Sequence, residues 1–156
     1  MEILREYRPS DAAATLEVFL AAVTGTAAAD YSPEQISAWA RADDRPLPAW
    51  HAAMAARRAF VIESGGAVAG FSDVAASGFI DMMFVSPRFL RRGVATRLLA
   101  HAEDLARRSG AVELSADVSI TARPFFESRG FAVVAEQHPV RAGVALTNFR
   151  MRKPLE

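Results

Sequence analysis

Residues that could bind an anion gather in the segment from Phe89 to Thr96, which reads Phe-Leu-Arg-Arg-Gly-Val-Ala-Thr. Gly93 allows the backbone to approach a ligand closely, and Arg91 and Arg92 add positive charge beside it. A helical pattern starts at Val94, so unpaired backbone N–H groups and the positive end of a helix dipole fall at the same point. We therefore expect a phosphate-type site here. The alternative is a plain turn between a strand and a helix with a solvated arginine pair.

Asp81 is the second residue with evident chemical potential, because it interrupts an otherwise apolar stretch. Burying a carboxylate without partners is costly, so Asp81 must either be paired or lie in a cavity. A carboxylate placed in a cavity is a candidate functional residue. The alternative is an ion pair with one of the arginines.

The elements that position these residues follow from periodicity. Phe79–Val85 is short, apolar and bounded by turn residues, which predicts a buried strand. Apolar residues at helical spacing predict a helix from Val94 to Gly110. The alternation from Val112 to Val118 predicts the next strand, parallel to the first, so the unit is a right-handed βαβ crossover.

The remaining elements are predicted from alternation, caps and turns. Pro9-Ser10-Asp11 gives a helix N-cap, and Ser32-Pro33-Glu34-Gln35 gives a capping box. A Gly-Gly turn joins two strands into a hairpin. The expected elements are strand 2–8, helix 11–23, a short helix after residue 32, helix 50–58, strands 60–63 and 68–74, helix 121–128, and strands 131–136 and 144–151.

Two motifs resemble the GCN5-related N-acetyltransferase (GNAT) superfamily. The segments Val85-Ser86-Pro87 and Arg91-Arg92-Gly93-Val94-Ala95 resemble its pyrophosphate-binding segment, Arg/Gln-x-x-Gly-x-Gly/Ala after a splayed strand, with Leu90 in the Arg/Gln slot. The segment from Phe125 to Phe131 resembles its second signature, Leu-Tyr-Glu-Lys-x-Gly-Phe. The resemblance covers nearly the whole chain and is closest to small bacterial acetyltransferases that end in Asn-Phe-x-Met-Arg.

The resemblance implies an α+β fold in which a central mixed, mostly antiparallel sheet is splayed at its fourth and fifth strands and flanked by helices. It implies a single N-acetyltransferase domain over residues 1–156. The implied activity is transfer of an acetyl group from acetyl-CoA to an amine of a small molecule or peptide, by direct attack in a ternary complex.

The resemblance also assigns roles to residues. The N–H of Val85 would stabilise the oxyanion, and Asp81 matches the position of a glutamate base in histone-acetylating members. Phe126 stands where many members place a tyrosine acid, so Tyr31 is our candidate for protonating the leaving thiolate. The residues expected to contact the cofactor are Met83, Phe84, Val85, Arg91, Arg92, Gly93, Val94, Ala95, Thr96, Ser119 and Phe126.

Composition limits the remaining possibilities. Charge is balanced, with 18 basic and 18 acidic residues, so nothing suggests a nucleic-acid partner. Cysteine is absent, which excludes a cysteinyl intermediate and a thiolate metal site, and we expect no metal. We expect no apolar run near the roughly 20 residues of a membrane span. We therefore expect a cytoplasmic protein, monomeric or homodimeric, with no membrane partner.

Two other functions are compatible with these residues. The chain could be a catalytically silent acyl-CoA-binding module that kept the cofactor site but lost the acid. It could also be an unrelated phosphate-binding α/β protein that uses the same loop.

Overall fold

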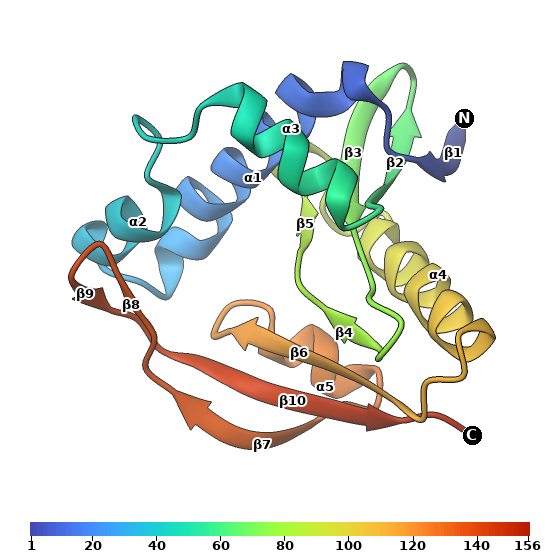
Figure 1. Cartoon of the computed structure of the whole chain (residues 1–156). Helices are drawn as coiled ribbons and strands as arrows, with labels where there is room; N and C mark the ends of the chain where they lie inside the picture. Colours follow the sequence, from blue (N-terminus) through green and yellow to red (C-terminus); the bar gives the residue numbers. More distant parts are fainter.

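Two four-stranded sheets form the centre of the computed structural model, which describes residues 1–156 throughout (Figure 1). The strand order is β1-β2-β3-β5 in the first sheet and β4-β6-β10-β7 in the second. The bounds are β1 Glu2–Glu6, β2 Phe60–Ser64, β3 Ala67–Ser72, β4 Phe79–Ile80, β5 Met83–Val85, β6 Glu113–Ser119, β7 Ala132–Gln137 and β10 Asn148–Pro154, with a small hairpin of β8 Val140–Arg141 and β9 Val144–Ala145.

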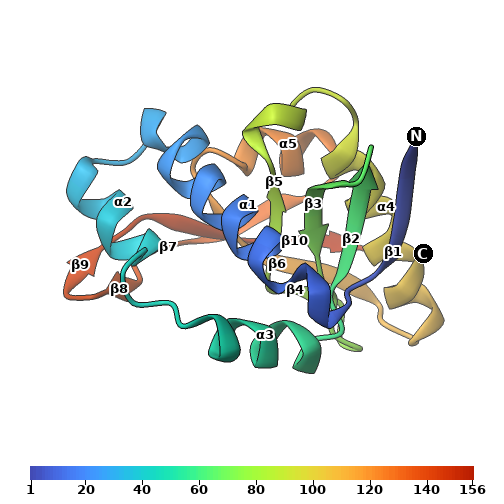
Figure 2. The ribbon, with the colours of Figure 1, turned by 90° about the horizontal axis from the view of Figure 1, so that it is seen from above.

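Five α-helices flank these sheets. They are α1 Ala12–Thr24, α2 Pro33–Ala40, α3 Leu47–Ala56, α4 Val94–Arg108 and α5 Arg123–Ser128, with 3-10 turns at Pro9–Asp11, Thr26–Ala29 and Pro87–Phe89. Helices α1 to α3 lie together on one side, and α4 lies beside both sheets (Figures 1 and 2). The expected mixed, mostly antiparallel architecture flanked by helices is confirmed.

The prediction of one continuous strand over Phe79–Val85 is wrong, because the segment forms two short strands, β4 and β5. Strand β4 pairs in parallel with β6, whereas β5 pairs antiparallel with β3. The carboxylate of Asp73 accepts the backbone N–H groups of Asp81 and Met82 at 2.9 and 3.0 Å. These bonds turn the chain out of one sheet and into the other, so the splay expected at this strand is present.

Gly78 fixes the closed end of the splay. Its φ of +91° is unfavourable for other residues, and a Cβ there would lie only 1.9 Å from the carbonyl oxygen of Glu113. Ser115 donates its N–H to the Gly78 carbonyl at 3.0 Å. The glycine therefore allows the chain entering β4 to lie directly against β6.

Helix α4 packs over the junction of the two sheets, as its predicted apolar stripe requires. Leu98 and Ala102 are fully buried, and one hydrophobic cluster joins them to Ile62 of β2 and Met151 of β10. The predicted end of this helix at Gly110 is also close, since α4 ends at Arg108.

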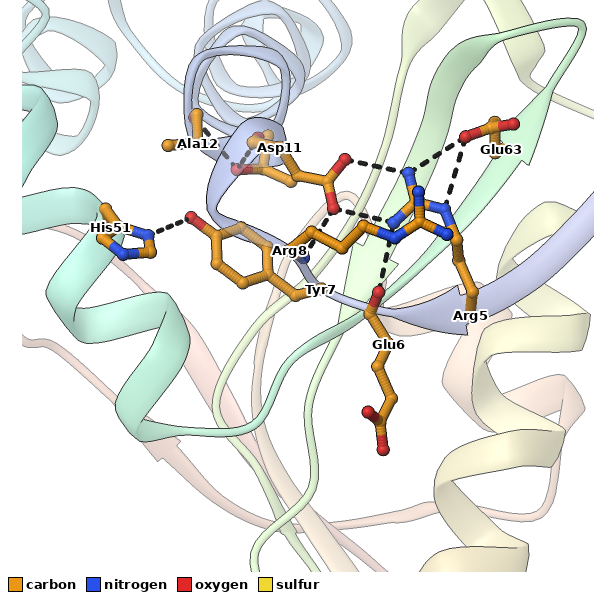
Figure 3. A network of polar contacts seen from close by, with 9 residues as sticks. Arg5, Glu6, Tyr7, Arg8, Asp11, Ala12, His51 and Glu63 are labelled. Carbon is orange, nitrogen blue, oxygen red and sulfur yellow. Dashed lines mark hydrogen bonds and ion pairs between the residues drawn. The ribbon is translucent and has the colours of Figure 1, made fainter.

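The N-terminal strand is attached by a charged network (Figure 3). Arg5 donates two hydrogen bonds to the carboxylate of Asp11 at 2.8 and 2.9 Å and reaches Glu63 at 3.0 Å. Asp11 also accepts the N–H of Arg8 at 2.7 Å. The turn and N-cap predicted from Pro9-Ser10-Asp11 are present, since Asp11 is the N-cap residue of α1, but its side chain bonds to Arg5 and to the Arg8 N–H and not to the N–H groups of α1.

Helix α1 corrects the expectation that no apolar run reaches membrane-spanning length. The continuous helical stretch Pro9–Ala29 is long and apolar enough to cross a membrane by length and composition alone, a test that core helices also meet. Here Phe19 and Val23 are 2% and 0% exposed within a core cluster that includes Trp50. The apolar character of α1 is thus accounted for by packing.

The last predicted strand, 144–151, is also divided, into β9 and β10. Strand β9 turns away to form the hairpin with β8, which lies beside α2 (Figure 1). Gln35 connects them, since its side-chain amide donates to the Ala145 carbonyl at 3.1 Å. The capping box predicted for Ser32 and Gln35 is confirmed by bonds of 2.9 and 3.1 Å.

Candidate active site

The loop before α4 presents a row of free backbone donors. No N–H group from Leu90 to Thr96 donates a hydrogen bond within the protein, and the first to bond back is Arg97, to the Gly93 carbonyl at 3.0 Å. Arg91 and Gly93 both adopt left-handed φ values, +62° and +77°. Free amides in such a turn at a helix N-terminus form a concave anion site.

The side chains of this loop add positive charge around the free amides. Arg91 and Arg92 are exposed, and the Arg92 guanidinium lies 5.5 Å from the ring centroid of Phe89. Arg129 reaches in from the end of α5 and donates to the Thr96 hydroxyl at 2.9 Å. The structure thus brings the six predicted loop residues, Arg91 to Thr96, together with a third arginine that the sequence analysis missed.

Strand β5 has a free edge that faces away from β3. Ser86 donates to the Ala69 carbonyl at 2.8 Å and Asp73 donates to the Met82 carbonyl at 3.3 Å. In an antiparallel pair such bonded positions alternate with non-bonded ones, so Met83 and Val85 direct their N–H and C=O groups away from β3. The Val85 N–H is therefore available at an unpaired strand edge.

The side chains of β5 alternate between two environments. Met83 and Val85 pack against the core cluster that includes α4, whereas Phe84 packs edge-on against Phe19 of α1 with ring centroids 5.0 Å apart. Phe84 also lines a cavity on that side. The three residues predicted to contact the cofactor thus form both the unpaired edge and one wall of the cavity.

This cavity has a volume of about 340 Å³ and lies among helices α1 and α2, the β8–β9 hairpin and the diverging strands. Its walls combine aromatic and charged side chains. The residues used below are Phe19, Tyr31, Arg41, Arg45, Asp81, Phe84, Asp117, Ser119, Arg141 and Thr147. A concave site with a few convergent polar groups is typical of small-molecule binding.

Asp81 lines this cavity, but not in the apolar setting that the sequence suggested. Its side chain is 50% exposed, and Arg57 donates to it at 2.6 Å. The ion pair considered as the alternative is therefore present. Because Asp81 follows the end of β4 instead of lying within a strand, it escapes the burial expected for it.

The buried carboxylate of this region is Asp73, which the sequence analysis missed. Asp73 is 2% exposed, and burial raises its pKa to about 6. Two backbone N–H donors and the charge of Arg57, 3.6 Å away, act in the opposite direction and lower the pKa. The pair Ser72-Asp73 at the end of β3 was the signal that could have found it, because Ser and Asp side chains often bond to backbone groups where a strand ends.

Tyr31 lies in the cavity wall with its hydroxyl already engaged. It donates to the Thr147 carbonyl at 2.6 Å and accepts the Ile120 N–H at 3.0 Å. Burial raises the pKa of Tyr31, although the bond from Ile120 opposes this. The hydroxyl therefore joins the end of β6 to the start of β10.

The two remaining predicted cofactor residues lie near β6. Ser119 ends β6, lines the cavity, and its hydroxyl accepts the Ala122 N–H at 3.1 Å. Phe126 is 4% exposed and packs edge-on against Phe125 and Phe131. Their contacts with a cofactor stay predictions.

Asp117 is a further carboxylate in the cavity that the sequence analysis did not single out. Partial burial opposes ionisation, but hydrogen bonds from Arg150 and Gln137 more than offset it and lower the pKa of Asp117. The alternation of β6 places it on the same face as Ser119, which was a usable signal.

Comparison with known proteins gives consistent matches. A family model described as an acetyltransferase (GNAT) domain matches residues 27–153. An uncharacterized N-acetyltransferase, YafP of Escherichia coli (strain K12), is 40% identical over 149 residues, which is 96% of this chain and 93% of that protein.

Two solved structures place the fold. A GCN5-related N-acetyltransferase from Rhodopseudomonas palustris superimposes with a TM-score of 0.93 at 35% identity, covering 99% of this chain and 96% of that one. YncA of Salmonella typhimurium, a putative acetyltransferase solved with acetyl-CoA, superimposes with a TM-score of 0.74 at 22% identity, covering 100% and 95%.

Proposed function

The chain belongs to the GCN5-related N-acetyltransferase family, and we propose that it transfers the acetyl group directly to an amine within a ternary complex. It is an acetyl-CoA-dependent acyltransferase, so the phosphate-binding loop does not belong to an unrelated α/β protein. The proposal concerns the route of transfer, the residues that carry it and the kind of acceptor, a small molecule or a peptide.

The observation that carries the proposal is the position of the unpaired edge of β5 beside the free amides of Leu90 to Thr96. The amides suit a pyrophosphate, because they are orphan donors at a helix N-terminus. The β5 edge suits an extended amide-containing arm, which can pair with it as an added strand. Coenzyme A carries both groups, and in its acetylated form it supplies a thioester.

Residues at the edge of β5 and in the cavity would then carry out the transfer. The Val85 N–H binds the thioester oxygen and stabilises the negative charge that forms there, a contact worth roughly 3 to 4 kcal/mol. The amine approaches from the cavity, where Asp81 accepts its proton directly or through water. A C–N bond forms, the C–S bond breaks, and the thiolate takes a proton from Tyr31 or from water.

The test is acetyl-CoA binding followed by turnover on a broad panel of amines. We expect acetyl-CoA to raise the melting temperature and the protein to release CoA in the presence of an acceptor. Stabilisation without turnover on any amine would instead support the catalytically silent acyl-CoA-binding module. Ping-pong kinetics would contradict direct transfer, since they require an acetylated enzyme.

A further inference from the structure

The cavity described above contains a guanidinium with no carboxylate partner. Arg45 is half-buried, and it donates to the carbonyls of Ala40 at 2.6 Å and Trp39 at 2.9 Å at the end of α2. Its guanidinium carbon lies 4.5 Å from the ring centroid of Phe19. No acidic side chain lies within ion-pair distance, so the charge is held in place without a counter-ion.

The acidic side chains of the cavity do not neutralise Arg45, because each is paired elsewhere. Asp81 is bound by Arg57, and Asp117 is bound by Arg150. Neither of these two arginines lines the cavity.

A second cation of the cavity is the exposed Arg141, in strand β8 of the hairpin. Its side chain makes no hydrogen bond or close ion pair, although its charge helps to lower the pKa of Asp117. Arg41 also lines the cavity but is paired with Asp44. The balance inside the cavity is therefore positive, although the whole chain carries no net charge.

A half-buried cation without a bonded counter-ion is costly to maintain. Burial and the neighbouring charge of Arg41 lower the pKa of Arg45, although the charge of Asp44 opposes them. An anion bound in the cavity would relieve this cost. Arginine is well suited to the task, because its planar donors match a carboxylate or phosphate in a two-bond geometry.

We propose that the acetyl acceptor is a small amine that also carries an oxyanion, which Arg45 and Arg141 bind while the amine faces Asp81. This inference rests on the proposed function and names its substrate class. A cavity of about 340 Å³ lies near the lower end of the roughly 300 to 1,000 Å³ usual for ligand pockets, which favours a compact acceptor. A free α-amino acid carries such a carboxylate, and an amino phosphate monoester carries the same chemistry in its phosphate.

The experiment compares amines in matched pairs that differ only in the anionic group. L-phenylalanine is paired with 2-phenylethylamine, L-lysine with cadaverine, and phosphoethanolamine with ethanolamine. We expect at least one anionic member to have a tenfold or greater advantage in kcat/KM over its neutral partner, and the pair that shows it distinguishes carboxylate from phosphate. Turnover that never favours the anionic member would overturn the inference while leaving acetyl transfer intact. No transfer to any amine would overturn both.

Variants of Arg45 and Arg141 test whether these two arginines cause the preference for anionic amines. Arg45→Met and Arg141→Met should each remove most of the advantage of the anionic member, leave kcat/KM for the neutral member within about twofold, and leave CoA affinity unchanged. The Arg141 side chain is exposed and makes no hydrogen bond or close ion pair, so its variant remains informative if Arg45→Met fails to fold. Arg108→Met, at an exposed position of α4 outside the cavity, is the control. Equal losses on both members of a pair would show that the arginines act on the fold and not on the acceptor.

Discussion

The carboxylate of Asp73 accepts the backbone N–H of Asp81 at 2.9 Å, so the buried acid holds the exposed one at the break between β4 and β5. Asp73 therefore positions the residue that we propose as the base. Two acids only eight positions apart thus have different tasks, because one is enclosed by the sheet and the other borders the cavity.

Asp73→Asn should change how stability depends on pH. Burial raises the pKa of Asp73 from 3.8 to about 6, so its protonated form is favoured by folding. Its contribution to stability is complete below about pH 4 and is lost as the pH rises through about 6, by up to about 3 kcal/mol. The unfolding free energy of the native protein relative to the variant should fall across that range. A constant difference between the two proteins from pH 4 to 7 would contradict the raised pKa.

Gly93→Glu should lower CoA affinity by tenfold or more, because it puts a negative charge among the amides that would bind the pyrophosphate. Calorimetry with CoA measures this directly. Gly110→Glu at the other end of α4 is a matched control, since both glycines have left-handed φ values, +77° and +84°, and open space around a built Cβ. Both variants should lose a similar amount of stability, about 1 kcal/mol. Equal CoA affinities in the two would place the pyrophosphate elsewhere.

Asp81→Asn should lower kcat/KM on basic alkylamines with little effect on CoA affinity. Such amines have a pKa near 10 and need a base to expose their lone pair, whereas weakly basic aryl amines are already neutral at pH 7. The loss should therefore be much smaller for an aryl amine. Asp117→Asn, which changes the other carboxylate of the cavity, should not show this dependence on amine basicity. Similar losses on both amine types, or a collapse of the melting temperature, would identify Asp81 as a structural partner of Arg57.

Tyr31→Phe should lower turnover tenfold or more if its hydroxyl protonates the leaving thiolate, given the usual ~10²- to 10⁴-fold contribution of general-acid catalysis. Its hydrogen bonds to Thr147 and Ile120 also support the fold, at about 1 kcal/mol each. Tyr7→Phe is the comparison, because that hydroxyl bonds to His51 at 2.8 Å and does not line the cavity. Turnover that survives in Tyr31→Phe would remove this residue from the mechanism.

Arg5→Met should destabilise the protein by roughly 3 to 5 kcal/mol, because it leaves the carboxylate of Asp11, which is 6% exposed, without its charged partner. Partial burial alone would raise the pKa of Asp11, but the hydrogen bonds from Arg5 and from the Arg8 N–H outweigh it and lower the pKa. Its contribution to stability is therefore present above about pH 4 and lost as the pH falls through the lowered pKa. Denaturant unfolding of the variant should show a weaker loss of stability in acid. Arg108→Met, which removes an exposed pair with Asp104, should cost less than about 1 kcal/mol.

Much of the architecture could be predicted because local signals were strong. The spacing of Leu98 and Ala102 predicted α4, and the Gly-Gly turn predicted the β2–β3 hairpin, both as the structure has them. The anion loop was predictable for the same reason, since Gly93 and the start of a helix are adjacent in the sequence.

The residues that the sequence analysis missed depend on contacts between distant segments. Asp73 breaks the strand by bonding to residues eight and nine positions later, and Arg57 reaches Asp81 across 24 positions. Periodicity within Phe79–Val85 contains no information about either contact. Arg45 becomes part of a cavity only when α1, α2 and the β8–β9 hairpin come together around it, and the local sequence does not predict this arrangement.

The break between β4 and β5 also has a consequence for how the chain assembles. Every strand partner of β5 and its sheet comes from residues before Ser86, and every partner of β4 and its sheet comes from residues after Gly78. Each sheet can therefore form from one part of the polypeptide without any strand from the other sheet. We expect native-state hydrogen exchange to resolve two cooperative units that α4 joins. The gap between β5 and β6 is then the boundary between these units, and a ligand that pairs with the free edge of β5 should slow hydrogen exchange at that boundary first.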